Sequence, residues 1–170
     1  MDRGVSQLEQ FRRQKDDFMR EPDSPIAPAD RVTFIGLKYF PDNPALAFDL
    51  ELDTQVPNDQ ITMETSDGRK KTYTRAGRVN FAVAGQPATL SVYEDEHGYF
   101  MPFRDATSGL DSYAAGRYLE PEMVNGKLHV DFNYAYNPYC AYSERYSCPL
   151  PPAENWLKVP IRAGERKFKD

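Results

Sequence analysis

Apolar residues near the start of the sequence recur at the spacing of a helix. Four side chains follow one another at intervals of three or four residues, with polar residues between them: Leu8, Phe11, Lys15 and Phe18. Residues at this spacing lie on one face of an α-helix. Ser6 and Glu9 have the spacing of a capping box, which satisfies free N–H groups where a helix begins. The pattern predicts a helix over residues 6–20, and its narrow apolar stripe indicates a helix packed on the outside of the fold.

From residue 31 onward the apolar positions alternate with a period of two. In residues 45–53, ALAFDLELD, the side chains Leu46, Phe48, Leu50 and Leu52 share one side of an extended chain. This alternation is typical of a half-buried strand. Three turn dipeptides lie between further strand-like segments, as in β-hairpins: Asp67-Gly68, Gly85-Gln86 and Asn125-Gly126. Short strands separated by such turns predict a mainly β fold, an antiparallel β-barrel or β-sandwich.

A long loop rich in tyrosine and proline is expected near the C-terminus. Residues 131–156, DFNYAYNPYCAYSERYSCPLPPAENW, hold both cysteines and a cluster of tyrosines and prolines. The last strand is expected in NWLKVPIRAG, with Leu157, Val159 and Ile161 facing inward. With no linker or repeat in the sequence, we expect a single domain of residues 1–170, in which the β body spans residues 31–165.

Composition and charge narrow the classes of function. The chain is 40% apolar and 28% charged, which is typical of a globular protein. Its net charge of −5 is spread over interspersed acidic and basic residues, so no nucleic acid partner is expected. Two short stretches are locally basic, KVPIRAGERKFKD (residues 158–170) and GRKKTYTRAGR (residues 68–78); such stretches are typical of solvated surface, with anion binding as the alternative. Neither a signal-peptide core nor a run of about 18 apolar residues is present, so we expect a cytoplasmic protein without a membrane partner.

The first candidate for a ligand site is a polar segment without strand alternation. Residues 100–121, FMPFRDATSGLDSYAAGRYLEP, carry Arg104, Asp105, Arg117 and Tyr118 around glycines. Loops with such donors and acceptors bind polar ligands, and an arginine can bind a carboxylate or phosphate through paired N–H groups. The alternative is an ion pair between arginine and aspartate that fastens an irregular loop to the β body.

The second candidate is the polar run DFNYAYNPY. Asp131 and Asn133 are expected to share one face of a strand, with Tyr136 and Asn137 following at a turn. Asn and Asp form strands poorly, so their presence here needs a reason. Two remain open: these side chains satisfy the backbone of the following loop, or they contact a ligand.

Cys140 and Cys148 suggest metal binding or thiol chemistry. Together with His97 and His129 they make up the four ligands that a structural zinc site needs. The seven residues between the cysteines and the strand alternation around His129 disfavour zinc, so no metal or cofactor is expected. A catalytic thiol needs a neighbour that lowers its pKa, and the sequence supplies no evident base. We therefore expect reduced cysteines that serve as buried packing residues.

Three long motifs resemble a known family. FIGLKYF, PFRDATSGLDSYAAGRYLE and DFNYAYNPYCAYSERYSCPLPPAENWLKVPIRAGER are similar to those of domain of unknown function 1684, a family of bacterial and archaeal proteins. The resemblance implies no established activity. It implies that the family's recurrent elements here are residues 104–109, 115–119, 131–133, 137–142, 148–152, 154–155 and 163–165. Both histidines lie outside these elements, which further disfavours zinc, and the polar character of the elements favours a shared site.

These observations lead to one main hypothesis and two alternatives. The main hypothesis is a β domain, with or without an enzymatic activity, that binds a small polar or anionic molecule. Its pocket is expected to be lined by Arg104, Asp105, Arg117, Tyr118, Asp131, Asn133, Tyr136 and Asn137. Asp131 is the first candidate for a general base. The alternatives are a structural or interaction domain, in which the same residues form a buried network, and a thiol enzyme that uses Cys140.

Overall fold

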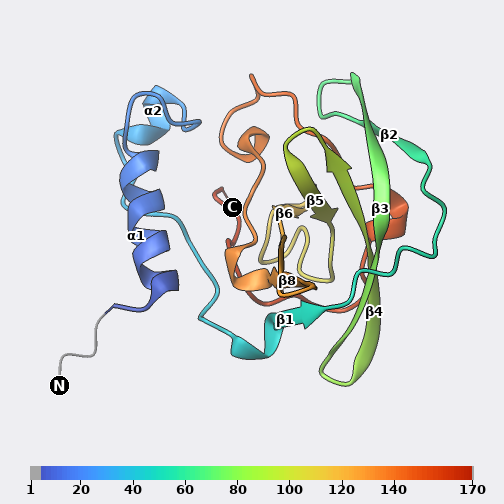
Figure 1. Cartoon of the computed structure of the whole chain (residues 1–170). Helices are drawn as coiled ribbons and strands as arrows, with labels where there is room; N and C mark the ends of the chain where they lie inside the picture. The colour runs from blue at the N-terminus through green and yellow to red at the C-terminus, as the bar shows by residue number, and fades with distance from the viewer. Residues whose placement is uncertain (1–4, 170) are drawn as a thin grey trace.

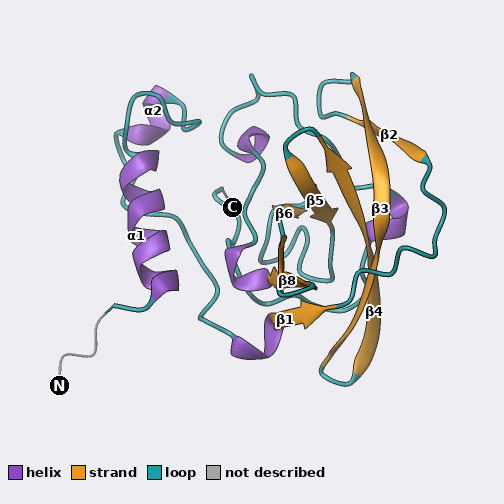
Figure 2. Cartoon of the chain, in the orientation of Figure 1, coloured by secondary structure: helices purple, strands orange, loops and turns teal. Residues whose placement is uncertain are grey.

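The structure of the protein is a computed structural model, and it describes residues 5–169. Within this range, eight strands form two antiparallel sheets, with the orders β1-β8-β7 and β2-β3-β4-β5-β6 (Figures 1 and 2). The strands are β1 (Ala47–Leu50), β2 (Gln60–Glu64), β3 (Lys70–Val83), β4 (Gln86–Asp95), β5 (Gly98–Phe103), β6 (Arg117–Leu119), β7 (Glu122–Val124) and β8 (Lys127–Asp131). The larger sheet curls like half of a barrel (Figure 1). The prediction of a mainly β, antiparallel fold is confirmed.

The helices are few and mostly short. The α-helices are α1 (Gln7–Met19) and α2 (Pro28–Arg31). Four 3-10 helices complete the set: η1 (Pro44–Leu46), η2 (Phe132–Tyr134), η3 (Tyr139–Ala141) and η4 (Ala153–Asn155). The predicted N-terminal helix is thus present, and the side chain of Ser6 caps it by accepting the N–H of Glu9 at 3.1 Å.

Helix α1 contacts loop segments of the chain. Figure 1 shows α1 beside the C-terminal segments, on the side of the molecule opposite the long strands β3 and β4. Phe11 packs edge to face on Tyr134 with ring centroids 4.9 Å apart, and Lys15 forms an ion pair with the buried Glu165. Phe18, which the sequence placed on the apolar stripe, remains 43% exposed. The helix is therefore attached by a mixture of aromatic and charged contacts.

Three tight turns connect the main hairpins. Asn125 and Gly126 both have positive φ angles, 52° and 82°, as the two central residues of a type I′ turn do. Ala84 and Gly85 have the same pattern, with φ angles of 50° and 81°. This turn lies one residue earlier than the sequence indicated, and β4 begins at Gln86. The hairpin around Asp67-Gly68 joins β2 to β3 as predicted.

A β-bulge in β3 divides the two faces of the larger sheet. Arg75 pairs with Tyr93, and Gly77 pairs with Val92, so Ala76 is an extra residue. Because successive residues of β4 face opposite sides, the bulge turns the odd-numbered residues of β3 from one face to the other. Residues 70–83 therefore form one long strand that changes face at the bulge.

The main core fills the space between the two sheets. Its largest contributions from the larger sheet are Val79, Phe81, Leu90, Val92, Met101 and Phe103, and from the smaller sheet Leu128 and Val130. Phe132 from η2 lies between them and contacts the rings of Phe81 and Phe103 at 5.4 Å. A second apolar cluster, Met63, Tyr73 and Tyr93, covers the opposite face of the larger sheet. The β-bulge places Tyr73 in this second cluster.

The expected last strand is absent: residues 156–164 have no strand within the described chain. Val159 and Ile161 nevertheless face the main core, as the alternation predicted. Side chains pair with the backbone of this segment where a neighbouring strand would. Asp105 Oδ2 accepts the Ile161 N–H at 2.6 Å, and Arg117 donates to the Ile161 carbonyl at 2.8 Å. The segment therefore follows the core surface without joining a sheet.

The expectation that Asp131 and Asn133 share a strand face is also wrong. Strand β8 ends at Asp131, and Phe132–Tyr134 form the 3-10 helix η2. The Asp131 carboxylate caps η2 by accepting the N–H of Asn133 at 3.0 Å. This local hydrogen bond competes with continued strand pairing, as Asp and Asn side chains commonly do.

Candidate functional site

The arginine expected to orient a ligand lies in the interior. Arg117 is fully buried, and its guanidinium donates to three main-chain carbonyls: Ile161, Ala163 and Glu165. Asp105 lies 3.4 Å from the same guanidinium and is itself 6% exposed. Burial lowers the pKa of Arg117, and the Asp105 carboxylate opposes this effect. With no exposed surface, Arg117 contacts protein groups only.

The two predicted asparagines are buried as well. Asn133 binds the backbone of Asn43 through both ends of its amide, at 2.8 and 2.9 Å. Asn137 donates its side-chain N–H to the Arg166 carbonyl at 3.0 Å, and its main-chain N–H to Glu165 at 3.1 Å. Both side chains therefore hold main-chain groups of distant segments in place, those of Asn43 and Arg166, and not the backbone of the loop that follows them.

The remaining predicted residues divide between separate places. Arg104 is half-buried and stacks its guanidinium on the ring of Trp156 at 4.8 Å. Asp131 lines one surface cavity, beside Glu122 and His129. Tyr118 and Tyr136 line another cavity, on the second face of the larger sheet. The eight predicted residues do not surround one pocket, but two of them lead to a better candidate.

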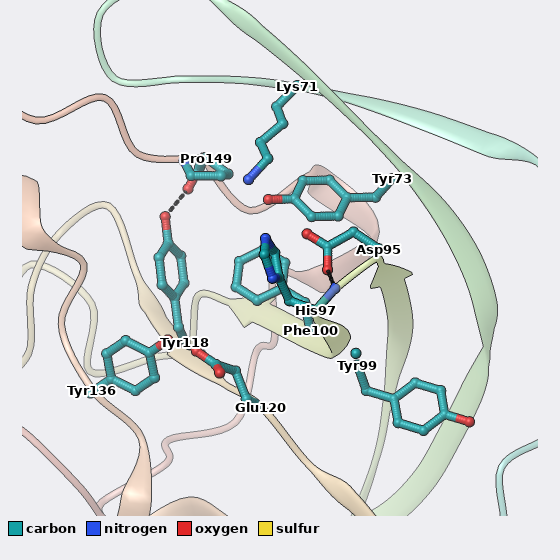
Figure 3. A pocket seen from close by; sticks show the side chains of 11 residues that line it. Lys71, Tyr73, Asp95, His97, Tyr99, Phe100, Tyr118, Glu120, Tyr136 and Pro149 are labelled. Atoms are coloured by element: carbon teal, nitrogen blue, oxygen red, sulfur yellow. Dashed lines mark hydrogen bonds between the residues drawn. The ribbon is translucent and has the colours of Figure 1, made fainter.

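The cavity at Tyr118 and Tyr136 has a volume of about 290 Å³ (Figure 3). It is lined by Lys71, Tyr73, Asp95, His97, Gly98, Tyr99, Phe100, Tyr118, Glu120, Tyr136 and Pro149. We call it the Lys71 cavity. In Figure 3 the amine of Lys71 and the hydroxyl of Tyr73 point toward the same space, whereas the Tyr99 ring points away from it.

Strand pairing brings the lining residues together from distant parts of the sequence. Lys71 and Tyr73 precede the bulge in β3, so both project from the second face. Asp95 pairs with Gly98 at the end of the β4-β5 hairpin, where His97 lies in the turn. Tyr118 on β6 pairs with Tyr136 of the C-terminal loop through two main-chain hydrogen bonds of 2.8 and 3.0 Å.

The cavity offers one permanent cation and neutral phenols. Contact with the Tyr73 hydroxyl raises the pKa of Lys71, so its ammonium group stays charged near neutral pH. Burial raises the pKa of Tyr73, Tyr118 and Tyr136, so these phenols stay protonated. Tyr118 donates to the Pro149 carbonyl and Tyr136 donates to Glu120, which leaves the Tyr73 hydroxyl beside Lys71.

Two carboxylates lie at the margin of the same cavity. Asp95 Oδ1 accepts the main-chain N–H of His97 at 2.8 Å, and Glu120 Oε1 accepts the Tyr136 hydroxyl. Each carboxylate has a second oxygen with further acceptor capacity. The site can therefore bind negative charge at Lys71 and hydrogen-bond donors at Asp95 and Glu120.

Most of this cavity was missed from the sequence. Lys71, Tyr73, Asp95, His97 and Glu120 were not among the predicted site residues. The available signal was the basic stretch of residues 68–78, for which anion binding was the alternative reading. The bulge at Ala76 and the pairing of distant strands decide which of its side chains meet, and neither is visible in local patterns.

The structure shows no metal cluster in the part of the chain that it describes. Within residues 5–169, no three His, Cys, Asp or Glu side chains gather in a metal-binding arrangement. His129 lies on the exposed face of β8, where its ring contacts Asp49 at 2.9 Å. In the same range, no helix is both long and apolar enough to cross a membrane.

Fold and cavity together define a mainly antiparallel β protein with a small polar pocket on one face of its larger sheet. The chain belongs to the family described as proteins of unknown function, DUF1684, whose model matches residues 32–166. It is similar to an uncharacterised protein of Haloarcula marismortui with a solution NMR structure. The two share 39% sequence identity with a TM-score of 0.70, over 94% of this chain and 92% of that one. No curated protein matches the chain.

Proposed function

We propose that the protein binds a small polar molecule with an anionic group in the Lys71 cavity. The observation that carries this proposal is the convergence of the Lys71 ammonium and the Tyr73 hydroxyl over a concave surface (Figure 3). Small-molecule sites typically combine a mostly apolar wall with a few convergent polar groups. The aromatic side chains Phe100, Tyr118 and Tyr136 supply that wall.

The charges around the cavity define the ligand more closely. An anionic group of the ligand binds Lys71, and hydroxyl or amino groups donate to Asp95 and Glu120. A ligand with several negative charges is disfavoured, because two carboxylates line the same space. Taking ~30 Å³ for each water-sized group, the cavity admits a ligand on the order of ten non-hydrogen atoms.

A thermal-shift screen of small carboxylates, phosphates and sugar acids tests the proposal. The variants are Lys71→Ala and its matched control Lys70→Ala, which removes the same charge from the opposite face of β3. A ligand at 100 times its dissociation constant adds about 2.7 kcal/mol of stability, which raises Tm by roughly 5–10 °C for a chain of this size. We expect this rise in the wild type and in Lys70→Ala, and its loss in Lys71→Ala. A ligand that stabilises all three proteins equally must bind outside the Lys71 cavity. A screen in which no compound raises the Tm of the wild type contradicts the proposal.

A second candidate function is a structural or protein-interaction role. It is supported by the buried polar side chains of Asp105, Arg117, Asn133 and Asn137, which bind backbone groups of the C-terminal segment and of the loop before η1. Under this proposal, the recurrent polar elements of the family stabilise the fold. The two candidates are compatible, because none of these four buried side chains lines the Lys71 cavity.

The wider setting is part of the same proposal. Both cysteines are free thiols, which favours a cytoplasmic location. The dispersed charge argues against nucleic acid and membrane surfaces as partners. We propose a single domain that acts without a metal or other cofactor.

A further inference from the structure

The two cysteines lie close together in the C-terminal loop. Cys140 is in η3, and the loop returns eight residues later so that the Cys140 N–H donates to Cys148 Sγ at 3.3 Å. An N–Cα bond measures about 1.46 Å, so this sulfur lies within about 4.8 Å of the Cys140 Cα. Disulfides join residues whose Cα atoms are about 4.4–6.8 Å apart. The Cys148 sulfur thus lies beside the Cys140 side chain, and the two thiols share a hydrogen bond, which brings their sulfurs within reach of each other.

The two thiols differ in their exposure to solvent and in the hydrogen bonds that hold their backbone. Cys140 is half-buried, whereas Cys148 is buried with 7% of its surface exposed. Ser66, in the β2-β3 turn, fixes Cys148 from both sides: its hydroxyl accepts the Cys148 N–H at 3.1 Å, and its N–H donates to the Cys148 carbonyl at 2.9 Å. Small reagents can thus reach Cys140 first, while Cys148 is held behind it.

The Cys140 sulfur accepts a hydrogen bond from a tyrosine of a distant segment. The Tyr113 hydroxyl donates to Cys140 Sγ at 3.7 Å. Hydrogen bonds from Cys148, Tyr113 and Ser66 lower the pKa of Cys140 to about 6, although burial opposes this change. The pKa of Cys148 is raised, mainly because its proton is shared with Cys140, and burial raises the pKa of Tyr113. Near neutral pH, Cys140 is therefore the thiolate, while Cys148 and Tyr113 keep their protons.

We propose that Cys140 and Cys148 form a reversible thiol–disulfide site, with Cys140 as the attacking thiolate and a small hydroperoxide as the oxidant. The site goes beyond the ligand proposal and does not depend on it. The sequence alone disfavoured such chemistry because no base stands near Cys140 in the chain. The fold supplies the Tyr113 hydroxyl instead, from 27 residues away in the sequence.

The reaction balances in two steps. The Cys140 thiolate attacks one peroxide oxygen, the O–O bond breaks, and the departing alkoxide takes a proton from water, leaving a sulfenic acid on Cys140. The Cys148 sulfur then attacks the Cys140 sulfur, the S–O bond breaks, and the hydroxyl leaves as water with the Cys148 proton. Two thiols are oxidised to a disulfide, and the peroxide is reduced to an alcohol and water. A dithiol reductant reverses the change.

The first test measures the reactivity of Cys140 in the folded wild-type protein. Iodoacetamide labelling is followed by mass spectrometry of the peptides at a series of pH values. We expect the labelling rate of Cys140 to reach half its maximum near pH 6, against about 8.5 for an ordinary cysteine. Tyr113→Phe should move this midpoint upward, because it removes a hydrogen bond to the thiolate. A Cys140 that does not react, or that titrates near pH 8.5, overturns the proposal.

The second test uses hydrogen peroxide. In the wild type we expect loss of both free thiols, an intramolecular peptide link between Cys140 and Cys148, and recovery on addition of dithiothreitol. Cys148→Ser should accumulate a sulfenic acid at Cys140, which dimedone traps. Cys140→Ser should keep the thiol of Cys148 unoxidised. Circular dichroism checks that each variant is folded; the wild-type peptide map decides the question if a variant is not. Two free thiols after peroxide treatment, or links between different chains only, would refute the site.

Discussion

At the scale of single residues, several buried polar side chains act as substitutes for a missing strand. Arg117 and Asp105 pair with the backbone of residues 161–165, which belong to no sheet. Asn155 does the same between strands, binding Ser91 on both its N–H and carbonyl at 2.8 and 2.9 Å, and the Pro102 carbonyl at 2.9 Å. Buried backbone groups need such partners, so these side chains allow an irregular segment to lie in the core.

Replacement of Arg117 by alanine should strongly destabilise the protein. It leaves three buried carbonyls without the guanidinium that donates to them and removes the only charge that pairs with the buried Asp105 carboxylate within the described chain, and breaking a buried pair in this way costs about 3–5 kcal/mol. Arg162→Ala is the matched control, because its pair with Asp111 is exposed and contributes less than about 1 kcal/mol. Urea denaturation measures both changes. Similar losses for the two variants would contradict the role assigned to Arg117.

The sequence identified these residues without identifying their purpose. Arg117, Asp105 and Asn133 stood out as polar residues in unexpected places, and both a ligand and a structural network were open explanations. Burial distinguishes the two, and burial depends on contacts between segments more than forty residues apart. Local patterns contain no information on such contacts, which is why the eight predicted residues lie partly in the interior and partly in separate cavities.

At the scale of elements, the hairpins were predictable and their faces were not. Turn dipeptides such as Asn125-Gly126 encode their own geometry, because positive φ angles favour these residues. The bulge at Ala76 has no comparable local signal, yet it determines that Lys71 and Tyr73 lie on the face opposite the main core. Helix α1 was likewise predictable from its cap and spacing, but its contacts with the C-terminal loop were not.

The attachment of α1 can be tested through Lys15. Its ammonium pairs with the buried Glu165 and lies 4.9 Å from the ring centre of Tyr136. Lys15→Ala removes this contact, and hydrogen bonds to charged groups contribute about 1.5–3 kcal/mol. We expect amide hydrogens of residues 7–19 to exchange at least about tenfold faster, with little change in β3 and β4. Arg13→Ala, an exposed change on the same helix, is the control, and equal rates in the two variants would exclude a specific role for Lys15.

At the scale of the whole molecule, ion pairs on the second face of the larger sheet connect it to the C-terminal segment. Glu154 receives two hydrogen bonds of 2.9 Å from Arg75, one of 3.1 Å from Ser91 and one from Tyr93. Burial raises the pKa of Glu154, but these hydrogen bonds outweigh burial and lower it overall. The Glu154 carboxylate therefore binds a proton less tightly in the folded protein than in the unfolded chain.

This shift predicts a specific loss of stability in acid. An unfolded glutamate has a pKa of about 4.3, so Glu154 stabilises the fold above that pH, and the contribution disappears as pH falls through the lower folded value. The stability difference between wild type and Glu154→Gln should therefore be largest at neutral pH and shrink below about pH 4. Urea denaturation at several pH values measures it. A difference that stays constant with pH would contradict the shift.

The location of residues 159–163 in the main core affects how the protein is made. Ribosomes release a chain from its N-terminus, so all eight described strands emerge before Val159, Ile161 and Ala163. Until these residues arrive, the apolar surfaces of both sheets lack part of their cover, and partly covered sheets are prone to aggregate. Newly made chains thus pass through an interval in which apolar surface is exposed, and the interval ends with the segment that no sheet contains.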